Sequence, residues 1–247
     1  MILNSDRIIL IPTYNEAQNI IPLYEQIRTE CDFDLLFIDD NSPDGTADLI
    51  QQLVESDGGV ALLRRGEKKG LGQAYRAAFR HVQEIGKWKR VFMMDADLSH
   101  QPSHIRRIDK ALDQYHFVIG SRYLKGVSVL NWSILRLNMS YTANKYIRFI
   151  TRLPYTDCTS GFRGFHADVI PVLLSSGIKA SGYAFLVETL FGVWKEGIEI
   201  GEVPIVFVER KMGASKVSSG IFIESFFTPI RLLLKSVFRG LGSNLSS

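Results

Sequence analysis

The chain of 247 residues has only two cysteines, Cys31 and Cys158, and lacks any long uncharged stretch. Two cysteines are too few for a disulfide framework and are typical of a reducing cytoplasm. The longest run without a charge, Val169–Ile178, has about ten residues, whereas a membrane-spanning helix needs roughly 20 apolar ones, so we expect none. The N-terminal residues show no basic segment followed by a long apolar one, and we expect no secretory signal.

Internal repeats and low-complexity tracts are absent as well, and the composition is that of a folded protein. Hydrophobic residues make up 46% and charged residues 22%, values that exclude wholesale disorder. The net charge of +3 conceals an asymmetry, because residues 1–120 carry 14 basic and 18 acidic side chains and residues 121–247 carry 15 and 8. Such a split indicates that one half meets an anionic partner.

Short apolar runs alternate with helical patterns over the first 120 residues. Buried strands are predicted at Ile8–Thr13, Leu35–Asp40, Val60–Arg64, Arg90–Asp95 and Phe117–Ser121. Helices are predicted between them, at Glu16–Thr29, Ala47–Glu55, Gly72–Glu84 and Pro102–Gln114. This alternation predicts an α/β fold, a mostly parallel sheet with helices on both faces. Ligands of such sheets bind beyond the carboxyl ends of the strands.

The second half of the chain contains two amphipathic helical patterns. The first, residues 131–153, has a basic stripe formed by Lys145, Arg148 and Arg152. The second, residues 229–239, follows Thr228 as a predicted N-cap and has a basic face formed by Arg231, Lys235 and Arg239. Between them, residues 198–209 alternate as a strand, and Pro204 predicts an edge position.

Two carboxylates follow the predicted strand that begins at Arg90. Asp95 and Asp97 lie two residues apart, and anions so close repel each other unless a cation lies between them. Hard divalent cations prefer oxygen ligands and often bind substrate phosphates as well. The pair therefore predicts a Mg²⁺ or Mn²⁺ site on a nucleotide diphosphate, with a solvated turn as the alternative from spacing alone.

A second pair, Asp39 and Asp40, ends another buried strand ahead of a Ser-Pro-Asp-Gly turn. Asp44 and Gly45 suit the turn itself. Acidic side chains after strands often bind ribose hydroxyls in doubly wound folds, which explains one of the two strand-end aspartates.

These segments together carry a resemblance. The sequences at 11–16 (IPTYNE), 39–46 (DDNSPDGT) and 95–100 (DADLSH) are followed in order by 120–123 (GSRY), 160–163 (SGFR) and 213–216 (GASK). The ordered set resembles the family-two glycosyltransferases of the GT-A fold, a Rossmann-like α/β fold, and most narrowly the polyprenyl (dolichol-type) phosphate mannosyltransferases. The resemblance implies a catalytic domain over 1–217, including the helix at 131–153, and an amphipathic membrane-associating segment over 218–247.

The resemblance also implies a donor site. The residues implied to bind the nucleotide sugar are Pro12, Tyr14, Glu16, Asp40, Asp95, Ala96, Asp97, Arg210 and Lys216. The residues implied to bind the metal are Asp95, Asp97 and Ser99. Arg210 and Lys216 would clamp the diphosphate when their loop closes, since guanidinium and ammonium groups suit phosphate oxygens. A mobile basic surface loop is the alternative for that segment.

For the acceptor, the resemblance implies a phosphate site formed by Arg122, Arg136 and Ser140. Arg136 and Ser140 follow Trp132 at successive helical turns on one face. From spacing alone, packing of Trp132 and a surface charge at Arg136 explain the pattern as well. The role of two further acidic residues, Asp157 and Glu188, stays open. Each could contact the acceptor or form a structural salt bridge.

The expected activity is inverting transfer of a hexose, mannose from GDP-mannose, to a polyprenyl phosphate, giving a β-linked product. The cofactor implied is Mg²⁺ or Mn²⁺, and the catalytic residues implied are Asp97, Arg122, Arg136, Arg210 and Lys216. A phosphate monoester is largely dianionic at pH 7, so it needs no general base. The alternatives are UDP-glucose as donor, a saccharide acceptor with Asp157 or Glu188 as base, and a nucleotide-sugar-binding membrane adaptor without activity.

The expected partners are the nucleotide sugar, the lipid phosphate and an anionic membrane surface. The two basic amphipathic helices suit peripheral binding at the cytoplasmic face of a membrane. No basic-aromatic module predicts nucleic acid binding. Whether membrane partner subunits or a homo-oligomer are needed stays open.

Overall fold

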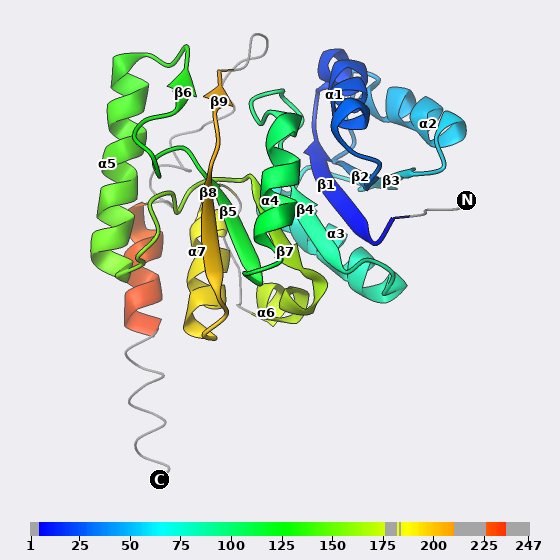
Figure 1. Ribbon diagram of the computed structural model, residues 1–247. Coiled ribbons are helices and arrows are strands. Elements are labelled where there is room, and N and C mark those ends of the chain that lie inside the picture. The colour runs from blue at the N-terminus through cyan, green and yellow to red at the C-terminus, as the bar shows by residue number, and fades with distance from the viewer. Residues whose placement is uncertain (1–4, 176–181, 183, 210–225, 236–247) are drawn as a thin grey trace.

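The computed structural model describes residues 5–175, 182, 184–209 and 226–235. Within these ranges the main sheet has seven strands in the order β3-β2-β1-β4-β7-β5-β8 (Figure 1). In chain order they are β1 (Arg7–Thr13), β2 (Asp34–Asp39), β3 (Val60–Arg64), β4 (Arg90–Met93), β5 (Phe117–Ser121), β7 (Arg163–His166) and β8 (Ile200–Pro204). A small second sheet pairs β6 (Val129–Leu130) with β9 (Phe207–Val208).

Strand β7 alone runs against the direction of the main sheet. It lies between β4 and β5 and is antiparallel to both. The β1–β2, β1–β4, β2–β3 and β5–β8 pairs are parallel. The carboxyl ends of β1, β2, β4 and β5 therefore meet at one edge of the sheet, where ligands of such folds bind.

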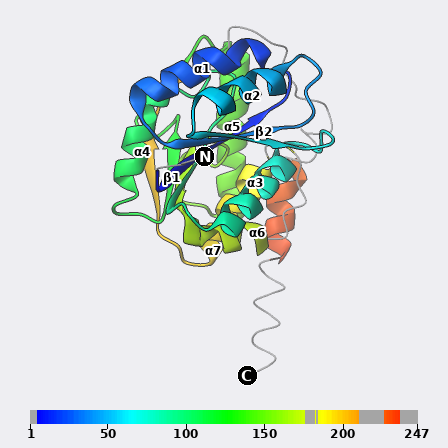
Figure 2. The same cartoon turned by 90° about the vertical axis from the view of Figure 1, so that its right-hand side faces the viewer.

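Helices cover both faces of the sheet, as Figure 2 shows with the sheet seen near its edge. One layer contains α1 (Ala17–Glu30), α2 (Thr46–Ser56) and α4 (Ile105–Ala111), which follows a short 3₁₀ segment, Pro102–His104. The other contains α3 (Leu71–Ile85), α6 (Ile170–Ser175), which follows the 3₁₀ segment Ala167–Val169, and α7 (Ala184–Lys195). Alternate residues of β1 face the two layers, so Ile9 packs toward α1 and Ile8 toward α3.

Two helices lie side by side at the β8 side of the sheet, α5 (Ile134–Thr151) and a helix over residues 226–235 (Figure 1). The Tyr146 ring of α5 stacks on the Phe226 ring at 5.1 Å between centroids, and its hydroxyl donates to the Phe226 carbonyl at 2.9 Å. The second helix is also tied to α7 by an ion pair between Arg231 and Glu188, and Leu232 packs into the core. No helix among the described residues is long and apolar enough to cross a membrane.

The predicted α/β class with a mostly parallel sheet is confirmed, and the strands of the first 120 residues begin and end within about two residues of the predicted bounds. The single strand predicted over 198–209 is wrong in extent. Strand β8 ends at Pro204, at the sheet edge as predicted, and β9 belongs to the small sheet. The division into 1–217 and 218–247 stays a prediction.

The last helix also differs from its prediction. Thr228 lies inside the helix and is not its N-cap, since residues 226 and 227 are already helical. Arg231 pairs with the buried carboxylate of Glu188 while 48% of its side chain stays exposed, and Lys235 is exposed as well. Arg239 lies outside the described residues.

Candidate active site

The loop after β4 carries the first of the two aspartates predicted to hold a metal. The Asp95 N–H donates to His100 Nδ1 at 3.0 Å, so His100 closes the loop on itself. Leu98 has a φ of 62°, in the left-handed region, which lets the chain turn back. The main chain at Gly161 comes close to the same carboxylate, since a Cβ added there would lie 3.6 Å from Asp95 Oδ1.

Asp97 is oriented by its neighbour Ser99. Its Oδ1 atom accepts hydrogen bonds from the Ser99 N–H at 3.1 Å and from the Ser99 hydroxyl at 2.6 Å. Ser99, predicted as a third metal ligand, is buried and contacts Asp97 instead of standing apart, so its role as a ligand stays a prediction. Ala96, between the two aspartates, is buried and packs in the core, and its role in nucleotide-sugar binding stays a prediction.

The electrostatics of the pair suit a cation. Although 37% of the Asp95 side chain is exposed, partial removal from water raises its pKa, His100 opposes the rise, and the Asp97 charge adds to it. A divalent cation would relieve both the desolvation and the repulsion. No group of three or more His, Cys, Asp or Glu residues in the described ranges could hold a metal by itself. Two carboxylates therefore fit a Mg²⁺ or Mn²⁺ ion that takes its other ligands from phosphate and water.

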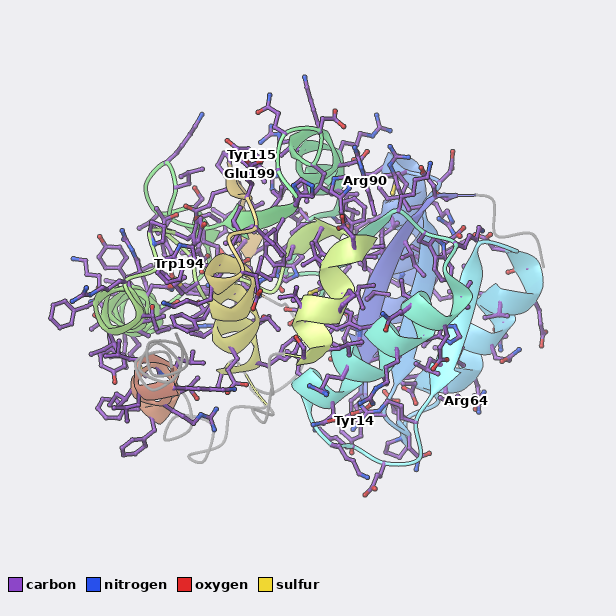
Figure 3. All side chains as sticks on the ribbon, turned by 90° about the horizontal axis from the view of Figure 1, so that it is seen from below. Tyr14, Arg64, Arg90, Tyr115, Trp194 and Glu199 are labelled. Atoms are coloured by element: carbon purple, nitrogen blue, oxygen red, sulfur yellow. The ribbon has the colours of Figure 1, made fainter. Side chains whose placement is uncertain are left out.

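The residues predicted to contact the base and ribose lie beside the loop between β3 and α3. The ammonium group of Lys68 lies 3.9 Å from the centre of the Tyr14 ring. Arg65 pairs with Asp40 at 2.6 Å, and removal from water raises the pKa of Asp40 while the Arg65 charge opposes the rise. Figure 3 shows Tyr14 on the same side of the molecule as Arg64, the last residue of β3. The β3–α3 loop thus borders the predicted nucleotide pocket.

Asp39, the other aspartate at the end of β2, has a structural role. It accepts hydrogen bonds from the Thr13 hydroxyl at 3.1 Å and from the Ser42 N–H at 2.9 Å. The Glu16 N–H donates to the Thr46 hydroxyl at 3.0 Å, which ties the loop after β1, beyond Pro12, to the start of α2. These bonds hold the two loops in register, and they leave Asp40 as the aspartate predicted to contact the nucleoside.

Arg122, predicted to bind the acceptor phosphate, forms a buried ion pair with Asp157. Its Nε and Nη2 atoms donate to the two Asp157 oxygens at 2.6 and 2.7 Å, and the Arg122 N–H donates to Oδ2 at 3.1 Å. The exposed fractions of the two side chains are 9% and 0%. Burial alone would raise the pKa of Asp157, but the Arg122 charge and its hydrogen bonds outweigh burial and lower it.

Arg136 and Ser140 lie on α5 next to Arg122. The guanidinium carbons of Arg122 and Arg136 lie 5.7 and 4.4 Å from the centre of one indole ring, that of Trp132. The Ser140 hydroxyl accepts from the Tyr123 hydroxyl at 2.8 Å, and the Arg136 Nη1 atom donates to Glu209. The structure therefore brings together the three residues predicted for the acceptor phosphate.

The segment after β8 connects the two parts of the site. The Phe207 ring centroid lies 5.5 Å from that of His100 and 5.4 Å from that of Trp132, and the Val208 N–H donates to the Ser99 carbonyl at 3.2 Å. The carboxylate loop and the acceptor side thus share one support. The other predicted residues of the donor side, Arg210 and Lys216, lie outside the described residues.

Three contacts of the site were not predicted from the sequence. His100 could have been found, because it lies five residues after Asp95 in the same motif. No local pattern signals the contacts of Asp157 with Arg122 or of Glu209 with Arg136, which join residues 35 and 73 positions apart. Asp157 and Glu188, which the sequence left open, both form salt bridges.

A mostly parallel sheet with one antiparallel strand, and with paired carboxylates shortly after β4, is the arrangement expected for a glycosyltransferase of the GT-A class. Residues 8–174 match the family described as glycosyl transferase family 2. The chain belongs to this family, in agreement with the motifs.

Curated relatives and solved structures add detail. The chain is 38% identical to an undecaprenyl-phosphate mannosyltransferase of Micrococcus luteus, over 96% of this chain and 97% of that one. It is 36% identical to a polyprenol monophosphomannose synthase of Mycolicibacterium smegmatis, over 89% and 84%.

Among solved structures, a glucosyl-3-phosphoglycerate synthase from Mycobacterium tuberculosis in complex with Mn²⁺ and UDP-glucose matches with a TM-score of 0.66 at 16% identity, over 93% of this chain and 78% of that one. A mannosyltransferase from Pyrobaculum calidifontis in complex with GDP-mannose and Mn²⁺ matches with a TM-score of 0.57 at 16% identity, over 98% and 76%. At such identities the likeness shows the fold alone.

Proposed function

We propose that this glycosyltransferase transfers mannose from GDP-mannose to a polyprenyl phosphate, with inversion at the anomeric carbon. The names of the relatives at 38% and 36% identity support both the sugar and the lipid acceptor. The structural observation that carries the proposal is the convergence of two arginines, Arg122 and Arg136, on the single ring of Trp132. Of the two, Arg136 can turn its guanidinium group to a phosphate, because its pair with Glu209 is exposed, whereas Arg122 is held by the buried Asp157 beside it.

The chemistry requires placement more than proton transfer. The acceptor phosphate is already a nucleophile, and a single in-line displacement of an α-linked nucleotide sugar gives a β-linked product. A saccharide acceptor would instead need a carboxylate base. Asp157 is buried against Arg122 with a lowered pKa, and Glu188 is engaged by Arg231. Both candidate bases are therefore occupied by arginines, which favours the phosphate acceptor over the saccharide one.

On the donor side, Asp95 and Asp97 would hold Mg²⁺ or Mn²⁺. An ion held there would supply positive charge to the departing nucleoside diphosphate. The chain's own part is to hold these carboxylates in place, through the Asp95 N–H on His100 and through Ser99 on Asp97. Arg210 and Lys216 are proposed to add positive charge at the same diphosphate, and Tyr14, Glu16 and Asp40 to bind the nucleoside.

We also propose peripheral binding to an anionic membrane through α5 and the helix over 226–235. Their exposed large hydrophobic side chains are Ile134, Leu135, Met139, Tyr141, Phe149, Phe226, Phe227, Leu233 and Leu234. The basic residues Lys145 and Arg148 on α5 and Arg152, its C-cap residue, are exposed as well. Each basic residue near an anionic surface contributes about 1 kcal/mol, and the apolar side chains add the free energy of burial.

The activity is tested with the full chain, Mn²⁺, radiolabelled GDP-mannose and undecaprenyl phosphate in detergent, with undecaprenol as the matched acceptor that lacks phosphate. We expect labelled lipid only with the phosphorylated acceptor, in the β configuration. Faster transfer from UDP-glucose than from GDP-mannose would show that the donor sugar is glucose and not mannose. Transfer to a free saccharide but not to the lipid phosphate would contradict the proposal, and so would the absence of nucleotide release with any lipid phosphate.

Membrane binding is tested separately by flotation with liposomes of neutral lipid and of neutral lipid with added anionic lipid. We expect the full chain to float with the anionic liposomes. A chain that stays in the dense fraction with both would show that peripheral attachment is wrong.

A further inference from the structure

Arg136 on α5, which is proposed to bind the acceptor phosphate, already pairs with a carboxylate of the protein in this structure. Its Nη1 atom donates to Oε1 of Glu209. On its other side the guanidinium carbon lies 4.4 Å from the centre of the Trp132 ring. The ring and the carboxylate together hold the Arg136 side chain in one direction. The carboxylate accepts from the same N–H group that a phosphate would use.

The two arginine–carboxylate pairs of the acceptor side differ in burial. In the Arg122–Asp157 pair the exposed fractions of the side chains are 9% and 0%, and in the Arg136–Glu209 pair they are 41% and 32%. Breaking a buried pair leaves an uncompensated charge and is costly, whereas an exposed pair contributes little to stability. Only the second pair can open readily when another anion arrives.

The main chain fixes where the Glu209 carboxylate stands. The Glu209 N–H donates to the Leu130 carbonyl at 3.0 Å, which extends the pairing of β6 with β9 by one residue. The carboxylate is thus presented from a strand end and not from an unattached loop. Glu209 also directly precedes Arg210, one of the cations proposed for the donor diphosphate.

We propose that Glu209 is an exchangeable counter-ion of Arg136, a specificity-determining residue that holds the arginine until the phosphate of the lipid displaces it. The inference rests on the proposed function of Arg136. A phosphate monoester carries nearly two negative charges and three acceptor oxygens, so it outcompetes one carboxylate for the guanidinium group. Lipids with an uncharged head group cannot displace Glu209 in this way. The exchange moves no proton and breaks no covalent bond.

The test is Glu209→Gln in the full chain, assayed with undecaprenyl phosphate and GDP-mannose. The amide keeps the size of the side chain and removes the competing charge. We expect the KM for the lipid phosphate to fall about two- to five-fold, the range for an exposed ion pair. The kcat and the KM for GDP-mannose should not change, because Glu209 has left Arg136 once the acceptor is bound. A lipid KM that is unchanged or raised, or a lowered kcat, would overturn the proposal.

A matched control removes the same kind of charge far from the site. Asp113 pairs with Arg90 at 2.6 Å, and Figure 3 shows Arg90 on the opposite side of the molecule from Tyr14. Asp113→Asn should leave all three kinetic constants unchanged. A fall in the lipid KM of this variant as well would assign the effect to net charge and overturn the role of Glu209.

Arg136→Met separates the inference from the proposed function. If Arg136 binds the acceptor, this variant raises the lipid KM, and adding Glu209→Gln to it has no further effect. If Arg136→Met leaves the lipid KM unchanged, the proposed acceptor site has failed. If it raises the KM while Glu209→Gln alone does nothing, only the role of Glu209 has failed.

Discussion

Replacement of Asp157 by asparagine tests the buried ion pair beneath the proposed acceptor site. The variant would leave the guanidinium of Arg122, whose side chain is only 9% exposed, without its counter-charge. Removing one partner of a buried pair costs about 3–5 kcal/mol. Since domains unfold with about 5–15 kcal/mol in total, the variant should still fold but lose a large share of its stability.

The assay is urea unfolding at pH 7, followed by tryptophan fluorescence, for the wild type, Asp157→Asn, Arg122→Met and a double variant with Arg122→Met and Asp157→Leu. Replacing both charges of a buried pair by apolar side chains is often neutral or stabilising. The double variant should therefore recover most of the free energy that Asp157→Asn loses. A loss below about 1 kcal/mol in Asp157→Asn would mean that the pair behaves as a surface pair and that this account of the site is wrong.

The same comparison has a pH signature. Burial would raise the pKa of Asp157, but the ion pair and hydrogen bonds from Arg122 lower it in the folded protein. In the unfolded chain an aspartate has a pKa of about 3.9. The carboxylate therefore stabilises the fold fully above about pH 4, and this contribution is lost as pH falls through the lower, folded pKa. The stability gap between wild type and Asp157→Asn should narrow below about pH 4. A stability difference that stays constant below pH 4 would show that the pKa of Asp157 is not lowered by its pair with Arg122.

Three further outcomes are expected. Asp97→Ala should abolish transfer at all Mn²⁺ concentrations without lowering the urea midpoint, and residual metal-dependent transfer would contradict its proposed role. Gly164→Ala should cost about 1–3 kcal/mol in urea unfolding, because the added methyl group would lie 2.5 Å from Ile108 Cγ2; an unchanged midpoint would show that β7 has room. Phe149→Glu should weaken liposome binding roughly tenfold or more, since this side chain is 83% exposed on α5. Ile85→Glu on α3 is its control and should float like the wild type.

The first half of the fold was predictable because its strands are buried on both faces. Continuous apolar runs such as residues 35–38 give a strong signal, and turn residues mark their ends. The carboxylates Asp40, Asp95 and Asp97 stand out for the same reason, since a charge at the end of an apolar strand needs an explanation. The sequence thus predicts which carboxylates follow the strands, and their role on the donor side stays a prediction.

Other features had no local signal. Strand β7 begins with the fully buried Arg163, which no apolar periodicity marks as a central strand. Helix α7 is buried on nearly every side, so its residues lack the 3.6-residue alternation of a surface helix. The contacts of Arg122 with Asp157 and of Arg136 with Glu209 depend on how distant segments pack, and a single sequence does not specify these pairings.

The structure also shows which basic residues of 121–247 are paired within the protein and which face solvent. Three of its arginines face carboxylates within the protein, Arg122 on Asp157, Arg136 on Glu209 and Arg231 on Glu188. Lys145 and Arg148 on α5, its C-cap residue Arg152, and Lys235 on the helix over 226–235 are exposed and can face an anionic surface.

Arg136 lies on the same helix as Lys145 and Arg148. Since α5 has 18 residues, its length is about 27 Å, and an α5 that lies on the bilayer would keep Arg136 near the level of the lipid phosphates. If the proposed membrane face is correct, a lipid acceptor would reach Arg136 without leaving the membrane. Phe149→Glu should then raise the KM for lipid phosphate in liposomes but not in detergent, whereas Arg136→Met should raise it in both.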